Sequence, residues 1–481
     1  MSVHVATLGS RNHRVNEVVI AAGLILVSVA TGVGLAIEPV LALLPIAALA
    51  SACLLVDGRA RIVFVVLGGL FVFQREQGLD MSKMAFLALF AVAFVGAFLN
   101  VRTLRDSPAY RLARPLLVAS TAFAVLAGVS LVIAHNNGTP LVGWWLRDTA
   151  PYLLFASAPI FALDAQAAVG RRRLVALLVT AGMVGAVAFA IHWLERRGIA
   201  NFQAETLGLA SHFVPAALFA YAMSAALHAR SMRWLAVAAP VLALLLVTGT
   251  RTNLVLFVAP VAIALATRRH RATRMIRLAL IGPIAVAITL VIGLGVLRIA
   301  SANEEYLTKR ISIFKSTGSS SDASYIERRR QMHAAWEVFK ENPILGSGPG
   351  TIFEWQTIDR KSAAHFLIDT PLTFPAKFGL LGLVILIFVV RQYWLFMRAL
   401  IRARDATAAY LGLVGYLAIV VVSAIALSPF ENKGFSFGLI LLLALVLSEV
   451  HEGRSSGGRL LPSVPRAHDD TSRSLFAGST R

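Results

Sequence analysis

The feature that most restricts this sequence is a series of uncharged apolar runs, each about 15 to 25 residues long, that recurs along nearly the whole chain. Helices of this length cross a bilayer, because a helix satisfies its own backbone hydrogen bonds there. The chain is 57% hydrophobic and 15% charged, which excludes an ordinary soluble domain and a disordered chain. The sequence therefore predicts an all-α, polytopic transmembrane helix bundle.

We expect about fourteen membrane spans, or about twelve if the short run 62–74 does not cross and 234–267 is one broken hairpin. The first run, 18–37, is expected to be a retained helix rather than a signal peptide, because no small-residue cleavage pattern follows it. The approximate bounds of the fourteen runs are 18–37, 39–56, 62–74, 84–101, 115–134, 149–170, 174–194, 206–229, 234–250, 252–267, 278–297, 371–390, 406–430 and 434–448.

The basic residues predict the orientation of the chain. If the sides alternate from a cytoplasmic N-terminus, clusters such as Arg171–Arg173 all fall inside, while the outer loops carry few cations, among them Lys83, Arg147 and Lys433. The formal net charge of +20 is explained by this loop bias and predicts no nucleic-acid partner. We therefore expect a multi-pass protein of the cytoplasmic (inner) cell membrane with both termini in the cytoplasm.

One connection is much longer than the others and divides the chain. The expected organisation is a cytoplasmic N-terminus (1–17), transmembrane helices (18–297), an extracytoplasmic loop with the candidate active site (298–370), C-terminal transmembrane helices (371–449) and a disordered cytoplasmic tail (450–481). The single cysteine, Cys53, excludes a disulfide framework and a cysteine-rich metal site.

The large loop is expected to contain an amphipathic helix. Ser324 and Glu327 form a capping-box pattern that predicts its start, and Asn342-Pro343 predicts its end. Its apolar stripe would be formed by Met332, Trp336 and Phe339.

Two features of this loop fit anion binding as well as simpler explanations. Arg328, Arg329 and Arg330 occupy the first turns of the helix, where cations oppose the helix dipole, so both an anion site and a solvated basic face remain open. Gly346, Gly348 and Gly350 follow the helix, and a plain turn is favoured there over an anion cradle.

Other polar residues are expected near the outer interface. Arg251 interrupts two apolar segments, where a charge is either functional or extended to the headgroups. Arg147 follows two tryptophans and precedes Asp148, so an aromatic belt and a local ion pair explain it, and a functional role stays open. His212 is a further candidate for the same cavity. His365 and Asp369 end the loop as a candidate base.

The order of these features resembles the O-antigen ligase and polysaccharide polymerase superfamily over about residues 240–390. The segments that carry the resemblance are Thr248-Gly249-Thr250-Arg251, Arg328, Trp336, Asn342-Pro343-Ile344-Leu345-Gly346-Ser347-Gly348, His365 and Lys377-Phe378-Gly379-Leu380-Leu381-Gly382-Leu383. His365 is followed by Phe366 where the family pattern has asparagine, so Asp369 is an alternative base.

The resemblance implies a metal-independent membrane glycosyltransferase without a cofactor. Its partners would be a glycan on a polyprenyl (undecaprenyl-type) pyrophosphate, a glycan, lipid or protein acceptor, and membrane lipid. Arg251 and Arg328 would hold the pyrophosphate, and His365 or Asp369 would take the acceptor proton. Ligase and polymerase activities remain open, and the rival classes are a lipid-glycan transporter or flippase and an inactive membrane scaffold.

Overall fold

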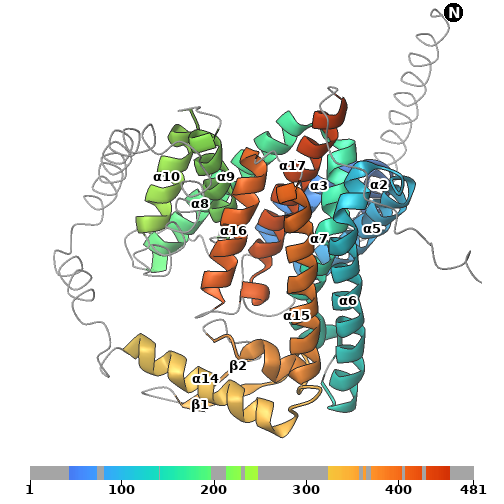
Figure 1. Ribbon diagram of the computed structural model, residues 1–481. Helices are drawn as coiled ribbons and strands as arrows, with labels where there is room; N and C mark the ends of the chain where they lie inside the picture. Colours follow the sequence, from blue (N-terminus) through green and yellow to red (C-terminus); the bar gives the residue numbers. More distant parts are fainter. Residues whose placement is uncertain are drawn as a thin grey trace, which may run out of the picture.

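The computed structural model describes residues 43–72, 81–139, 141–196, 213–228, 233–247, 323–356, 361–364, 370–402, 407–424 and 429–455. Most of these residues are helical, which confirms the predicted all-α bundle, and a short hairpin accompanies it (Figure 1). In chain order the elements are α2 (Leu43–Val56), α3 (Gly58–Val63), η1 (Phe64–Gly68), α4 (Gly69–Val72), α5 (Met81–Thr103), α6 (Pro108–Asn136), η2 (Leu141–Trp145), α7 (Leu146–Ala168), α8 (Arg171–Arg196), α9 (Phe213–His228), α10 (Arg233–Val247), α14 (Ala323–Glu341), β1 (Phe353–Gln356), β2 (Lys361–Ala364), α15 (Thr373–Arg402), α16 (Ala408–Ser423), η4 (Pro429–Glu431) and α17 (Lys433–Ser455).

Several helices have the length and apolar composition that crossing a membrane requires. Among the described residues, four helices of at least 18 residues are long and apolar enough to cross a membrane: Met81–Thr103, Pro108–Asn136, Thr373–Ile401 and Lys433–Val450. Shorter apolar helices are Ile46–Val56, Phe213–Leu227, Arg233–Leu242 and Ala408–Val421. The expected spans 18–37, 252–267 and 278–297 lie outside the described residues. Together these helices indicate a membrane protein.

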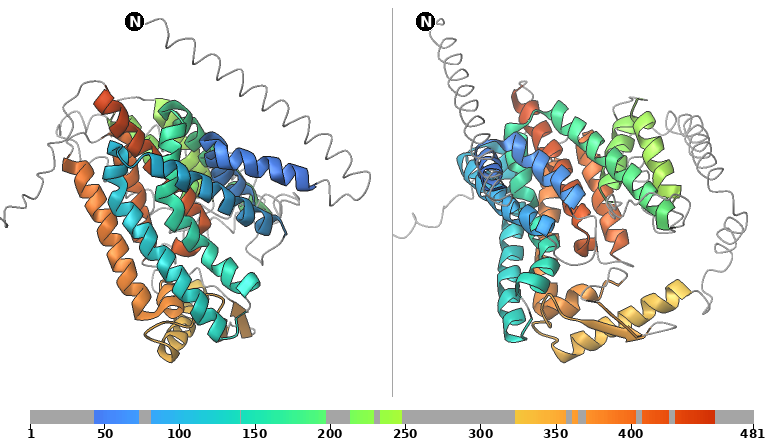
Figure 2. Two further views of the ribbon diagram at one scale, coloured as in Figure 1. Left: turned by 90° about the vertical axis from the view of Figure 1, so that its right-hand side faces the viewer. Right: turned by 180° about the vertical axis from the view of Figure 1, so that it is seen from behind.

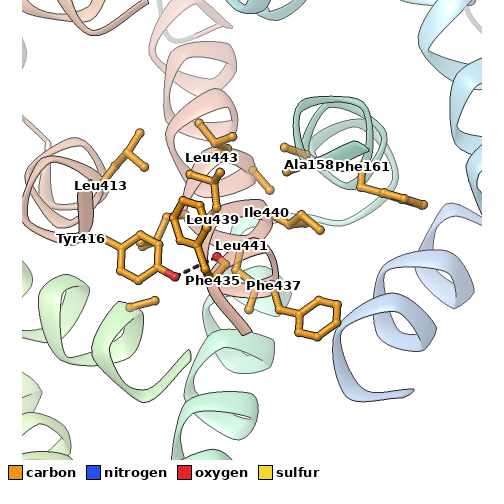
Figure 3. Close-up of a cluster of buried hydrophobic side chains, with 14 of the residues drawn as sticks. Ala158, Phe161, Leu413, Tyr416, Phe435, Phe437, Leu439, Ile440, Leu441 and Leu443 are labelled. Atoms are coloured by element: carbon orange, nitrogen blue, oxygen red, sulfur yellow. Dashed lines mark hydrogen bonds between the residues drawn. The ribbon is translucent and has the colours of Figure 1, made fainter. Parts of the chain in front are cut away.

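Helix α17 lies inside the bundle and forms much of its core. It packs against α7, α9 and α16, and the run Leu439–Leu447 is almost completely buried. Figure 3 shows Tyr416 of α16 on one side of α17 and Phe161 of α7 on the other, with the Tyr416 hydroxyl donating a hydrogen bond of 2.8 Å to the Phe435 carbonyl. A helix that is apolar all round is expected in such a central position.

The two ends of the bundle differ. Both views in Figure 2 show α14 and the β1–β2 hairpin gathered at one end, which we call the loop end. At the opposite end, Arg61 forms a buried two-bond ion pair with Asp164 (2.6 and 2.7 Å) and donates to the carbonyls of Leu54 and Leu55. Asn100 also donates to Asp164 at 2.7 Å. This cluster ties α3, α5 and α7 together, and Arg61 lies within α3.

Helix α14 has the predicted end but not the predicted start. It ends at Glu341, directly before Asn342-Pro343, as proline geometry requires. It begins at Ala323, so Ser324 is already helical and the capping-box assignment of Ser324 as the N-cap is wrong.

The buried face of α14 also differs from the expected stripe. Met332 and Trp336 are 44% and 45% exposed, whereas Phe339 of the expected stripe packs against a buried cluster formed by Ala335, Phe353 and Ala376. Small residues let the helix approach β1 and α15 closely, so α14 covers the loop end. The two strands pair antiparallel, from Phe353 opposite Ala364 to Gln356 opposite Lys361.

Candidate functional site: a charged cluster under the glycine turn

The turn at residues 343–350 is locked by glycine conformations that other residues adopt only with strain. Gly346, Gly348 and Gly350 have φ values of 75°, 84° and 88°. A Cβ added at Gly346 would stand 2.4 Å from the Lys377 backbone carbonyl, and one at Gly350 would stand 2.5 Å from the Thr139 methyl group. The three glycines therefore permit both the turn and its close approach to the bundle.

Helix α15 is kinked where this turn meets it. Gly379 has φ 62° and ψ −162° inside the helix, and a Cβ there would lie 2.4 Å from the Ile344 carbonyl. The kink lets the turn and the helix exchange backbone hydrogen bonds of 2.8 to 3.0 Å. These run from Ser347 N–H to Ala376 O, Gly348 N–H to Lys377 O, Leu380 N–H to Pro343 O and Leu381 N–H to Ile344 O.

This exchange decides between the two earlier interpretations of the glycines. The amides of Gly346, Ser347 and Gly348 donate to protein carbonyls, and the Gly350 amide donates to Asp148. These amides already donate hydrogen bonds within the protein, and they hold the loop in place. The turn interpretation holds, and an anion would have to be bound by side chains.

Below the turn lies a buried ionic cluster that joins three helices. The Lys377 ammonium, fully buried on α15, stands 3.1 Å from Asp148 Oδ2 on α7 and 3.0 Å from Glu431 Oε1 beside α17. The Tyr152 hydroxyl donates to the same Glu431 oxygen. Because a buried charge must be paired and hydrogen-bonded, each of these groups depends on the others.

Further cations border these three residues. Arg147 is 8% exposed, and its guanidinium stands 5.3 Å from the Trp144 ring centroid. Lys433, the first residue of α17, interacts electrostatically with Arg147, Lys83, Asp148 and Glu431. Within the described part of the chain the cluster contains Lys83, Arg147, Lys377 and Lys433 against Asp148 and Glu431, a formal surplus of positive charge. A surplus of positive charge in a region of low dielectric constant favours a nearby anion.

A second feature of the loop end is a polar cleft of about 750 Å³ between α14 and β1. It contains carboxylates, an indole and an arginine side by side, and exposed carboxylates of this kind accept hydrogen bonds from hydroxyl groups. Its lining includes Arg330, His333, Glu337, Glu354, Trp355 and Gln356. The Lys340 side chain, which donates a hydrogen bond to Glu337, holds the pKa of that exposed carboxyl below its usual value.

The predicted site residues fall into two groups. Arg147 lies in the charged cluster, Arg328 is half-buried on α14, and Arg329 is exposed beside it. Arg251, His212, His365 and Asp369 lie outside the described residues. No group of three or more His, Cys, Asp or Glu side chains suited to a metal ion occurs in the described segments.

Sequence reasoning missed the long-range partners of Asp148. The structure pairs this carboxylate with Lys377 and with the Gly350 amide, each more than 200 residues away. The available signal was that Lys377 is an isolated charge within the run 371–390, while Glu431 and Lys433 lie between the last two runs. All three are assigned to the same side of the membrane.

Comparison with known proteins covers the part of this site that includes Lys377 and the glycine turn. Residues 235–387 match the family model of O-antigen ligase. The match supports assignment to the O-antigen ligase superfamily. It confirms the resemblance seen in the sequence and includes α14, the glycine turn, Lys377 and the kink at Gly379. No curated protein matches the chain. O-antigen ligase-like glycan transfer at a membrane is the general activity that this family supports.

Proposed function

We propose that the protein is a glycosyltransferase that moves a glycan from a polyprenyl pyrophosphate carrier to an acceptor hydroxyl at the outer face of the cytoplasmic membrane. The observation that carries the proposal is the cationic cluster around Lys377 at the loop end, inside and beside the O-antigen ligase region. The charge bias of the loops supports an outward-facing loop end and cytoplasmic termini.

The chemistry requires stabilisation of a leaving pyrophosphate. Arg251 and Arg328 would hold its oxygens through paired N–H groups, and Arg147 would add positive charge from the cluster, with Arg329 and His212 as further candidates. The positive charge of these arginines then stabilises the leaving pyrophosphate, as a divalent cation does at many pyrophosphate sites. The buried position of Arg147 on α7 and the partial burial of Arg328 support such roles.

The transfer itself is a single displacement. The acceptor hydroxyl attacks the anomeric carbon, its proton passes to His365 or to the carboxylate of Asp369, and the carbon–oxygen bond breaks with its electron pair on the pyrophosphate. This sequence inverts the anomeric configuration. The cleft between α14 and β1 is suited to the acceptor, because its carboxylates and indole are exposed to a hydroxyl-rich ligand.

The test uses purified full-length protein, a polyprenyl-pyrophosphate-linked glycan and a lipid-linked acceptor. We expect release of polyprenyl pyrophosphate, and loss of that release in Arg251→Ala. Arg398→Ala, an exposed arginine on α15, is the matched control and should retain activity. Single and double substitutions at His365 and Asp369 identify the base.

The same assay separates the rival classes. Movement of the glycan lipid across vesicles without release of pyrophosphate would indicate a transporter, and neither activity would indicate a scaffold. Near wild-type release by Arg251→Ala would remove Arg251 from the mechanism. Activity of both single variants at His365 and Asp369 would remove the assigned base.

A further inference from the structure

A deep apolar groove runs along the bundle between α5, α6 and α7, from Arg102 and Arg105 at one end to Leu146, the residue before Arg147 of the charged cluster, at the other. Its volume is about 690 Å³. On α5 its lining extends from Leu87 to Arg102, which is about 22 Å of helix at 1.5 Å per residue. The remaining lining is mainly aliphatic and aromatic, with Phe90, Phe94, Phe98, Leu117, Leu153 and Ile160 among its residues.

The hydroxyl groups that line this groove do not make it polar. Ser120 donates to Leu116 O and Thr121 donates to Leu117 O, both on their own helix. Ser157 likewise donates to Leu154 O on α7. With these groups satisfied internally, the groove is suited to a hydrocarbon chain. Val95 and Phe98 are 49% and 41% exposed, so the groove is open along its side.

One end of the groove is cationic. Arg102 and Arg105 line it and are exposed, and Tyr110 adds a phenol there. The Arg102 guanidinium stands 5.0 Å from the Phe98 ring centroid. Among the described residues neither arginine forms an ion pair with a carboxylate, and the neighbouring Asp106 is exposed. A long apolar groove that ends at two such arginines matches an amphiphile with an anionic head.

We propose that this groove binds one acyl chain of an anionic phospholipid, with the lipid phosphate held by Arg102 and Arg105. The groove is long enough, because an acyl chain reaches the bilayer midplane after about 15 Å, half the hydrocarbon thickness, and the lining on α5 extends for about 22 Å. The position fits as well, since the loop charges assign this end to the cytoplasmic side, where anionic lipids attract basic residues. The proposed phosphate site at Arg102 is at the opposite end of α5 from Lys83 of the charged cluster.

The experiment uses delipidated full-length protein in detergent with phosphatidylglycerol or phosphatidylcholine, read by native mass spectrometry and thermal shift. We expect phosphatidylglycerol to bind and stabilise at concentrations on the order of tenfold lower than phosphatidylcholine. Inorganic phosphate at the same concentrations should leave the melting temperature unchanged, because it has no chain to fill the groove.

Two pairs of variants test the head and the chain separately. The double variant Arg102→Gln/Arg105→Gln should lose the preference for phosphatidylglycerol, whereas Arg111→Gln, exposed at the same end but outside the groove, should keep it. Ala124→Trp fills the groove and should abolish binding of both lipids, whereas Val118→Trp, an exposed position on α6 outside the lining, should not.

Two results would overturn the proposal. One is equal retention of phosphatidylglycerol by the wild type and by Arg102→Gln/Arg105→Gln. The other is displacement of the lipid from the wild type by an equimolar amount of polyprenyl phosphate, which would assign the groove to the carrier. Because lipid binding is measured without glycan transfer, neither result depends on the proposed enzymatic activity.

Discussion

The Gly350 amide donates a hydrogen bond of 2.9 Å to Asp148 Oδ2, the same carboxylate oxygen that Lys377 Nζ approaches at 3.1 Å. One atom of α7 therefore contacts both the glycine turn and the first turns of α15. The loop end and the membrane helices share a single buried ionic centre, and the following substitutions are chosen around it.

Lys377→Met should destabilise the protein by about 3–5 kcal/mol, because it leaves Asp148 and Glu431 buried without their shared cation. Thermal unfolding in detergent measures the loss. Lys340→Met, at the exposed pair with Glu337, is the control and should change stability by less than about 1 kcal/mol. The triple variant that also carries Asp148→Asn and Glu431→Gln should recover part of the loss. Equal losses of stability in Lys377→Met and Lys340→Met would contradict the buried ionic cluster.

Gly346→Ala should detach the turn from α15, because the new methyl group would lie within 2.4 Å of the Lys377 carbonyl and the residue would keep a φ of 75°. Limited proteolysis of the loop should become faster, and the melting temperature should fall. Gly128→Ala is the matched control, since nothing lies within 4 Å of its Cβ and it sits in a helix. A loop equally resistant in both variants would show that the turn does not dock as described.

Asp164→Ala should destabilise the opposite end, because it leaves the Arg61 guanidinium, 2% exposed, without its carboxylate. The expected cost is about 3–5 kcal/mol. Asp57→Ala provides the comparison, because it removes only an exposed helix cap worth about 1 kcal/mol. Similar melting temperatures for the two variants would argue against the buried pair.

Arg147→Ala should lower glycan transfer by about 10²-fold, on the proposed function, because it removes one cation of the surplus that attracts pyrophosphate. Release of polyprenyl pyrophosphate is the readout, and a circular dichroism melt checks that the bundle remains folded. Arg398→Ala again serves as the control. If Arg147→Ala leaves glycan transfer unchanged, Arg147 does not contribute to transfer and its role is structural.

The general fold could be predicted because its determinants are local. Apolar runs predict where α5, α6, α15 and α17 lie, although α6 begins before the run 115–134 and α15 and α17 extend beyond the runs 371–390 and 434–448, and proline geometry predicts the end of α14. The start of α14 was missed because a serine and a glutamate at the right spacing do not show which residue first becomes helical. The hairpin was missed because strands of four residues have too few positions to show a period.

The site could be predicted only in part, for a different reason. Arg147 and Lys433 are visible as isolated charges, and the loop bias assigns them to one side. Their convergence on Lys377 and Glu431 is tertiary and depends on how α7, α15 and α17 pack. Likewise, glycines in sequence predict a turn, but the exchange of backbone bonds with α15 requires the kink at Gly379.

That kink has a consequence for how the protein is assembled. With Gly379 at positive φ, the Ala376 and Lys377 carbonyls find their donors in the glycine turn, and the amides of the next helical turn find their acceptors there. Backbone groups without hydrogen-bond partners cost free energy in hydrocarbon. The kinked geometry is therefore stable only when residues 343–348 are docked against α15. We therefore expect biogenesis in two stages: a regular α15 enters the bilayer first, and docking of the loop afterwards bends it.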